Sequence, residues 1–233
     1  MVDSKPLLSV ASDVATRRCV LLFSRSPRAE ARAKRLQGAE GLFRIARERL
    51  VDAVVALDGV DLIELPQRGE TFAERLGHAF DDARCLGYGQ IVAVPGDVPG
   101  LDETHLRAAF AALDTADVVL GPCPDGGVYL IGSRGPVSRL FDGVRWRTGL
   151  VLADLLARTG NASLLVALAD LDRRRDLAAL ETDPALPAHI RALVSLLRRR
   201  SVIPRTEDDP WVGALFPTAP DRPRGPPGLP SLH

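Results

Sequence analysis

The sequence predicts a three-layer α/β fold, in which helices cover both faces of a mostly parallel sheet. Short apolar runs alternate with helical periodicities from about residue 19 to residue 168. Many of the runs show no polar alternation, as expected for strands that are buried on both faces. Polar segments follow most of them, and the carboxyl ends of such strands are where open α/β sheets bind ligands.

Seven apolar runs are predicted to be strands, because polar residues, glycine or proline bound them. The run before Gly96 is the clearest, since four apolar residues end abruptly before a Gly-Asp pair. The predicted strands cover residues 19–23, 53–57, 60–65, 91–94, 117–120, 129–132 and 163–168.

Helices are predicted where apolar residues recur every three or four positions. Phe72, Leu76 and Phe80 follow this spacing in the second predicted helix, and Asp102 is the expected cap of the third. The predicted helices cover residues 38–50, 71–86, 101–113, 150–159 and 190–200, and a short one starts at residue 176. Residues 24–34 are predicted to be a polar, basic connection.

The domain organisation follows from where these patterns begin and end. Residues 17–200 are predicted to form a single domain. Residues 1–16 have no clear periodicity and are predicted to be a loose arm. Residues 201–233 contain eight prolines and few aliphatic residues, so this tail is predicted to be disordered or draped along the surface.

The composition excludes several classes of function. The 233 residues include 30 Lys and Arg against 30 Asp and Glu, and this balance argues against nucleic-acid binding. Three scattered cysteines without a Cys-x-x-Cys pair indicate a reducing compartment. We recognise no signal peptide and no apolar stretch long enough to span a membrane, so a cytoplasmic protein is expected. The sequence leaves a homodimer open.

Gly96 and Asp97 form the most informative pair of residues, because prolines at 95 and 99 bracket them after a buried strand. A carboxylate on such a stiff turn suits a metal ligand or a nucleotide contact. Alternatively, Gly96 and Asp97 make a turn, and Asp97 caps the helix that starts near residue 102. The local sequence leaves both interpretations open.

The polar segment after the first strand holds five cations, which are Arg25, Arg28, Arg32, Lys34 and Arg35. Guanidinium groups bind phosphates through paired hydrogen bonds, so this segment suits a diphosphate or triphosphate. It lacks the glycine that phosphate loops normally contain. A solvated basic loop that leads into a helix explains the same residues.

Two glycine-containing turns are weaker candidates. Gln67 suits the edge of a base and Gly69 permits close approach, although a simple turn explains both. In the second turn, Gly126 and Gly127 would expose backbone donors to a ligand that Asp125 orients. A hairpin turn also explains this second segment.

Asp170 and Asp172 alternate, so in an extended segment both carboxylates point the same way. Two like charges on one face repel each other unless a cation lies between them. A divalent metal or the three arginines at 173–175 would supply that cation, and the sequence does not decide between them.

Six segments in order resemble a known family of bacterial transferases. They are S-P-R followed by K-R-L, then L-P-Q-R-G, P-G-D-V-P-G-L, D-V-V-L-G-P-C-P-D-G-G-V-Y-L-I-G, F-D-G-V-R-W-R-T and D-L-D-R-R-R-D-L, within about residues 20–180. The chain resembles GT-A-like transferases of the DUF2064 type, described as glycosyltransferases of arsenosugar or selenium-related gene clusters. It is more distantly similar to phospholactate guanylyltransferases and molybdenum-cofactor guanylyltransferases.

This resemblance implies a nucleotide-diphospho-sugar transferase (GT-A-like) fold and a nucleotide bound over the first loop. It implies Asp97 and Lys34 as catalytic residues, and Mg²⁺ or Mn²⁺ on Asp97 and Asp172. The other implied contacts are Arg25, Arg28, Arg35, Gln67, Gly69 and Gly96 for the nucleotide and its phosphates, and Asp125, Gly126 and Gly127 for the acceptor.

The chain departs from the family pattern in the first loop, where Ala29 and Glu30 replace an expected glycine. A helix expected between the second and third strands is also missing from the predicted elements. Glu30 would place a negative charge where phosphates approach.

Three functional hypotheses follow. The first is glycosyl transfer from a nucleotide-sugar to a small acceptor. The second is nucleotidyl transfer from a nucleoside triphosphate to a phosphorylated small molecule, which a lone Asp97 without an Asp-x-Asp pair favours. The third is a degenerate relative that binds a nucleotide or a partner without turnover, which the atypical first loop suggests.

Overall fold

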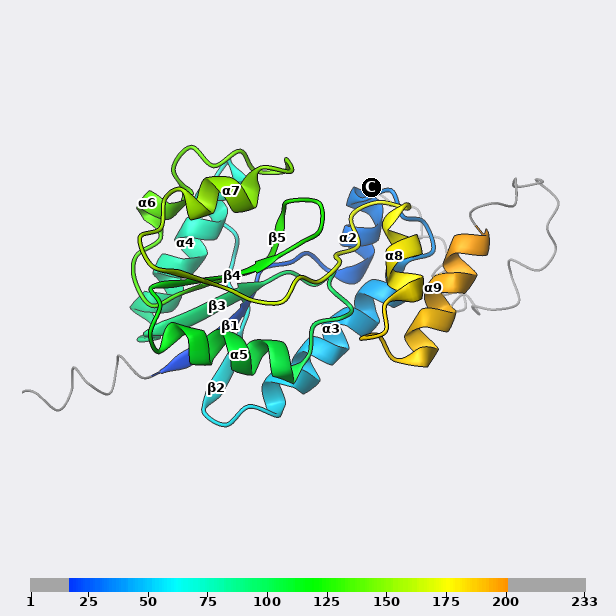
Figure 1. The fold of residues 1–233 in the computed structure, drawn as a ribbon, viewed down its shortest axis with the longest axis horizontal. Coiled ribbons are helices and arrows are strands. Elements are labelled where there is room, and N and C mark those ends of the chain that lie inside the picture. Colours follow the sequence, from blue (N-terminus) through cyan, green and yellow to red (C-terminus); the bar gives the residue numbers. More distant parts are fainter. Residues whose placement is uncertain (1–16, 201–233) are drawn as a thin grey trace, which may run out of the picture. The chain divides into compact units, whose positions relative to one another are not determined.

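A six-stranded sheet lies at the centre of the computed structural model, which describes residues 17–200 (Figure 1). The strands are β1 (Arg18–Leu22), β2 (Val60–Ile63), β3 (Gln90–Val94), β4 (Val118–Pro122), β5 (Val128–Ser133) and β6 (Ala162–Leu164), and their spatial order is β2-β1-β3-β5-β4-β6. Strand β5 runs antiparallel to its neighbours β3 and β4, and the other pairs are parallel. The predicted fold class, a mostly parallel sheet with helices on both faces, is confirmed.

Two layers of helices cover the sheet because successive strand residues point to opposite faces. The helices are α2 (Pro27–Ala33), α3 (Glu40–Val55), α4 (Phe72–Cys85), α5 (Glu103–Leu113), α6 (Ser138–Phe141), α7 (Val151–Leu156), α8 (Asp176–Thr182) and α9 (Ala188–Arg200). Val20 and Val92 pack with α3 and α5 on one face. Leu21 and Ile91 pack with α4, α6 and α7 on the other.

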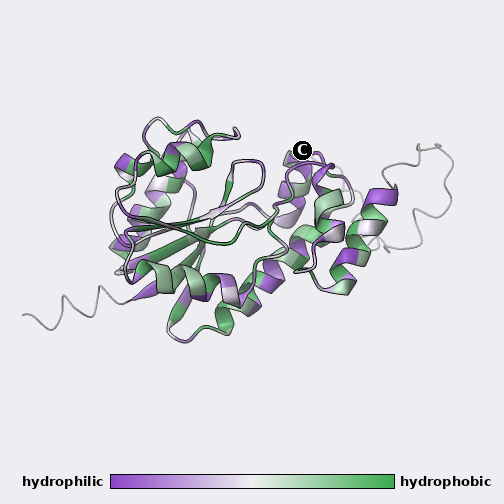
Figure 2. Ribbon diagram, viewed as in Figure 1, coloured by the Kyte–Doolittle hydropathy of each residue, from purple (hydrophilic) through white to green (hydrophobic). Residues whose placement is uncertain are grey.

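A third apolar cluster lies beside the sheet and joins α2, α3, α8 and α9. Its buried members include Ala31, Phe43, Leu177, Ile190 and Val194. Hydropathy follows this architecture, since Figure 2 shows apolar residues concentrated in the strands while the helices carry both kinds of residue. The cluster fixes α2, which carries the basic segment that follows β1.

The strand predicted at residues 53–57 is wrong, because this segment is the end of α3 and the turn after it. Leu50, Ala53, Val54 and Leu57 are buried, whereas Val55 is 80% exposed. That spacing is helical, so a short β-branched run continued a helix instead of starting a strand. The helix that seemed missing between the second and third strands is therefore α4, which connects β2 to β3.

The basic connection predicted at residues 24–34 contains helix α2, which the sequence analysis missed. Ser26 caps this helix by accepting a hydrogen bond from Ala29 N, and Pro27 occupies its first turn. The remaining differences are small: α6 is an additional one-turn helix, α7 is shorter than predicted, and β6 ends at Leu164 instead of residue 168. The predicted arm at 1–16 and tail at 201–233 lie outside the described residues.

None of the helices within residues 17–200 combines the length and the apolar character that crossing a membrane requires.

We predict that Gly132→Ala destabilises the protein by about 1–3 kcal/mol, because β5 crosses the core without room for a methyl group. A Cβ at Gly132 would lie 2.4 Å from Val119 Cγ1 and 3.3 Å from Val92 Cγ2. Urea unfolding measures the difference. The matched control is Gly41→Ala in α3, where no atom lies within 4 Å of the new Cβ and the change should be neutral or stabilising. Equal losses in both variants would contradict the prediction.

Candidate active site

Four connecting segments meet at the carboxyl edge of the parallel strands. They follow β1, β3, β4 and β6 and comprise residues 23–26, 95–102, 123–127 and 165–172. The chain leaves β1 toward β2 on one side and later returns to β3 on the other side. Such a point, where neighbouring connections diverge, is where open α/β sheets form a ligand-binding crevice.

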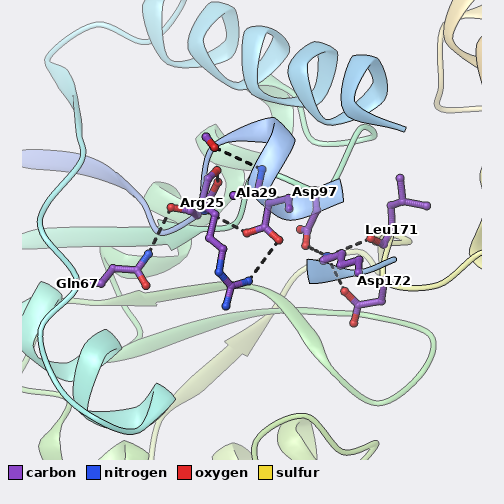
Figure 3. A network of polar contacts seen from close by, with 10 residues as sticks. Arg25, Ala29, Gln67, Asp97, Leu171 and Asp172 are labelled. Carbon is purple, nitrogen blue, oxygen red and sulfur yellow. Dashed lines mark hydrogen bonds and ion pairs between the residues drawn. The ribbon is translucent and has the colours of Figure 1, made fainter. Parts of the chain in front are cut away.

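Lys34 connects two of these segments, whose residues Asp97, Leu171 and Asp172 lie together in Figure 3. Its Nζ donates to Asp97 Oδ2, to Asp172 Oδ1 at 2.6 Å and to the carbonyl of Leu171 at 3.0 Å. The Leu171 N–H donates in turn to the Asp97 carbonyl at 3.0 Å. The three charged residues that the resemblance implied as central therefore meet in one cluster, which we call the Lys34 centre: Lys34, Asp97 and Asp172.

Local backbone geometry explains why Lys34 reaches this position. Lys34 is the C-cap residue that directly follows α2, and Arg35 after it has a positive φ of 56°. The Leu36 N–H then donates to the Ala31 carbonyl, which completes a Schellman-type helix end. Leu36 and Ala31 are buried in the third apolar cluster, so the helix end is held in place.

Gly96 brings the turn after β3 against the segment after β1. A Cβ at this position would lie 2.6 Å from Ser24 Oγ, so only glycine fits without a shift. The same turn presents Asp97, whose exposed fraction is 9%. The alternative that Asp97 caps the next helix is wrong, because Asp102 caps α5 by accepting from Thr104 N and His105 N.

Burial and charge act in opposite directions at the Lys34 centre. Burial raises the pKa of the Asp97 carboxyl, and the neighbouring ammonium of Lys34 opposes this rise. Burial by itself would lower the pKa of Lys34, but the carboxylates of Asp97 and Asp172 outweigh it and raise that pKa above its usual range. Lys34 is therefore protonated at neutral pH.

Asp97 and Asp172 also fit a divalent metal. Asp97 Oδ1 is buried and has no hydrogen-bond partner among the described residues, although Oδ2 contacts Lys34. A buried carboxylate oxygen without a donor or a cation is costly, and oxygen ligands are those that Mg²⁺ and Mn²⁺ prefer. Asp172 is half exposed and keeps its second oxygen accessible.

A second group of candidate ligands lies close by. One ligand atom from each of Cys123, Asp125 and Asp170 lies within 4.8 Å of the other two. Burial, followed by the charges of Asp172, Asp97 and Asp125, raises the pKa of Asp170 to about 7. Sequence analysis treated Cys123 only as an indicator of redox compartment. Its place two residues before Asp125, directly after a strand, was the signal that could have identified it.

The arginines at 173–175 do not supply the cation that the Asp-x-Asp pair needs. Among residues 17–200, Asp172 pairs with Lys34, and Arg175 pairs with Asp176 at 3.7 Å. Asp176 Oδ2 also accepts from the backbone N–H groups of Asp172 and Arg173, and these bonds order the turn.

The first-loop arginines are arranged differently from a phosphate cradle. Arg25 pairs with Glu30 at 3.6 Å, and its own N–H donates to the same carboxylate. Glu30 is buried, so its charge is directed toward Arg25 and away from solvent. Arg28 and Arg35 are exposed and make no ion pair within the described residues.

Gln67 lies at the far end of the network from Asp172, and its Nε2 donates to the Ser24 carbonyl at 3.3 Å (Figure 3). Gly69 serves a neighbouring helix, because a Cβ there would lie 2.7 Å from Glu74 Cβ in the capping box of α4. The structure thus joins Gln67 to the first loop and gives Gly69 a local structural role.

The turn at 123–127 joins β4 and β5 as a hairpin. Gly126 N donates to the Cys123 carbonyl at 3.1 Å, and Gly127 N donates to Asp125 Oδ1 at 2.9 Å. Both N–H groups are therefore used within the turn and are not presented to a ligand. A Cβ at Gly126 would lie 2.1 Å from the Gly149 carbonyl oxygen, so this glycine permits close packing of two loops.

Residues 33–148 match a protein-family model described as "Uncharacterized protein conserved in bacteria (DUF2064)". This match confirms the DUF2064 part of the predicted resemblance and includes Lys34, Asp97 and Asp125. The predicted similarity to phospholactate and molybdenum-cofactor guanylyltransferases is not confirmed. No curated protein is similar enough in sequence to count as a match.

The chain is also similar to solved structures. A protein from Desulfovibrio desulfuricans, provisionally named a nucleotide-diphospho-sugar transferase, is 24% identical with a TM-score of 0.65, and the alignment covers 79% of this chain and 97% of that one. A Mycobacterium sp. strain JC1 homologue of Mycobacterium tuberculosis rv0371c is 16% identical, with a TM-score of 0.48 and coverages of 77% and 98%. At 24% identity, the similarity to the Desulfovibrio desulfuricans protein supports the fold alone.

We predict that Lys34→Met lowers the free energy of unfolding by about 3 kcal/mol, because the buried Asp97 carboxylate loses its cation. Urea unfolding of metal-free protein near neutral pH measures this loss. Arg32→Met is the control, since Arg32 is exposed on the same helix and should change stability by less than about 0.5 kcal/mol. Similar values for both variants would show that the Lys34 centre does not stabilise the fold.

Proposed function

We propose that this protein is a divalent-metal-dependent transferase that uses an activated nucleotide, and that it transfers a sugar from a nucleotide-sugar to a small acceptor. The observation that carries the proposal is the Lys34 centre, where Asp97 retains a buried oxygen without a partner. It stands at the carboxyl edge of the sheet, next to the diverging connections of β1. The provisional name of the Desulfovibrio desulfuricans protein supports a nucleotide-sugar as the donor.

In this proposal Asp97 and Asp172 hold Mg²⁺ or Mn²⁺. The bound ion would neutralise phosphate charge and stabilise a diphosphate leaving group. Lys34 stays protonated, so it does not serve as a general base. Its three N–H groups hold the side chains of Asp97 and Asp172 and the Leu171 carbonyl in place. The exposed Arg28 and Arg35 add positive charge beside the same edge.

Gln67 is assigned to the base of the nucleotide, and Asp125 is assigned to the acceptor. Gln67 keeps its Oε1 available after Nε2 donates to Ser24, and an amide suits the polar edge of a base. Asp125 is exposed on the hairpin turn, and one of its oxygens is engaged within that turn. We place the small acceptor on this side. A cytoplasmic location and a homodimeric assembly stay predictions from the sequence.

Nucleotidyl transfer from a nucleoside triphosphate is the second candidate. One carboxylate follows β3, and the second comes from the distant segment after β6, so the two proposed ligands do not form an Asp-x-Asp pair on one loop. The products distinguish the candidates. Glycosyl transfer releases a nucleoside diphosphate, whereas nucleotidyl transfer releases pyrophosphate.

The third hypothesis, binding without turnover, is based on two features of the first loop, and one of them no longer supports it. Glu30 is buried against Arg25, and it therefore does not present its charge to phosphates as the sequence suggested. The absence of a glycine from the first loop remains as the argument for this third hypothesis.

We predict that nucleotide-sugars raise the melting temperature only when Mg²⁺ or Mn²⁺ is present, since a ligand that binds the folded state stabilises it. A thermal-shift screen of nucleoside triphosphates and nucleotide-sugars, with and without each metal, measures this. If no nucleotide shifts the transition at millimolar concentration with either metal, nucleotide use is excluded. A metal-dependent shift without any product would support the third hypothesis.

We further predict that Asp97→Asn and Asp172→Asn each lower turnover by about 100-fold or more, which corresponds to roughly 3 kcal/mol of transition-state stabilisation. Asp58→Asn, an exposed position remote in sequence from both ligands, is the matched control and should retain activity. Circular dichroism verifies that the variants are folded. Full turnover in folded Asp97→Asn would overturn the assignment of this residue.

A further inference from the structure

Cys123, Asp125 and Asp170 form a cluster of which the proposed transfer reaction uses Asp125 alone, on the acceptor side. One ligand atom of each residue lies within 4.8 Å of the others. We propose that these three residues form a second cation site, which binds a thiophilic divalent ion such as Zn²⁺. The inference does not depend on nucleotide transfer, because neither a nucleotide nor an acceptor takes part in it.

The backbone positions all three side chains. Cys123 directly follows β4, and its N–H donates to the Gly127 carbonyl at 3.0 Å, which closes the turn that also carries Asp125. Asp170 comes from the segment after β6. Hydrogen bonds on both sides of it fix that segment, from Leu168 N to the Pro122 carbonyl at 3.1 Å and from Leu171 N to the Asp97 carbonyl at 3.0 Å. Two separate connections therefore bring the ligands together.

The charge around this cluster is poorly compensated. Of the four carboxylates at 97, 125, 170 and 172, two form ion pairs within residues 17–200, and both do so with Lys34. Burial raises the pKa of the Cys123 thiol, and the charges of Asp170, Asp125 and Asp97 add to this rise. A cation placed among these groups would relieve their mutual repulsion.

The buried carboxylate of Asp97 adds to the uncompensated negative charge at this cluster. Asp97 is more than nine-tenths buried, and its Oδ1 has no partner among the described residues. Its carboxylate lies close enough to Cys123 and Asp170 that its charge raises the pKa of both. A cation at the cluster would offset part of this negative charge.

The ligand set favours zinc over magnesium. Mg²⁺ and Ca²⁺ take oxygen ligands, whereas Zn²⁺ accepts thiolate, carboxylate and mixed sets. Zn–S and Zn–O bonds of about 2.3 and 2.1 Å span up to about 4.4 Å, so atoms that lie within 4.8 Å need only small movements. On binding, the sulfur–metal bond forms as the thiol S–H bond breaks, and the proton passes to solvent.

Cadmium titration of the full-length, metal-stripped protein tests the thiolate ligand directly, because Cd²⁺–thiolate bonds give an ultraviolet charge-transfer band. We expect a band that saturates at about one equivalent of Cd²⁺ and disappears in Cys123→Ser. Cys85→Ser is the matched control, since Cys85 is exposed and should leave the band unchanged. A band that disappears in Cys85→Ser but persists in Cys123→Ser would overturn the proposal, and so would the absence of any band.

Asp125→Asn tests the site without altering a buried residue. Asp125 is exposed, and the amide retains an oxygen that can accept from Gly127 N, so the turn should persist. We expect the calorimetric affinity for Zn²⁺ to fall at least tenfold in this variant and to stay unchanged in Asp58→Asn. Equal affinities in wild type and Asp125→Asn would overturn the site as assigned.

Discussion

The contact of Lys34 with Asp97 and Asp172 is the constraint on which the site depends. A carboxylate as buried as Asp97 is tolerated only with a cation beside it. That cation arrives from α2, on the segment after β1, and it also ties down the loop after β6. One ammonium group thus sets the relative positions of three connections that are far apart in the sequence.

The third apolar cluster holds the helix end that carries Lys34 in place for this contact. Helix α2 has seven residues, too few to be stable alone, and the buried Ala31 and Leu36 attach it to α3, α8 and α9. The sheet therefore supplies Asp97, while a separate helical group supplies the lysine. The polar contact between Lys34 and Asp97 at the edge of the sheet therefore depends on the apolar packing that holds α2 beside the sheet.

The sequence predicted the fold class, most elements and the residues of the Lys34 centre, but not how they are joined. Residues 53–57 look like a strand because five consecutive apolar residues, two of them valines, form a short run. Only the burial of Leu50, Ala53, Val54 and Leu57 reveals a helix. Helix α2 was missed because Ala31 is the one buried apolar residue among its seven, so it carries no apolar periodicity. Likewise, the proximity of Cys123 to Asp170 depends on tertiary contacts that local patterns do not encode.

Because the segment after β1 is helical, insertions and deletions in it would alter the direction of the Lys34 side chain. Each residue of an α-helix turns the chain by about 100°, so one insertion between Ser26 and Lys34 would direct the lysine away from Asp97. Surface substitutions along α2 conserve that direction, whereas insertions and deletions destroy it. The segment is therefore expected to vary in composition among related chains but to keep a fixed number of residues from the end of β1 to Lys34.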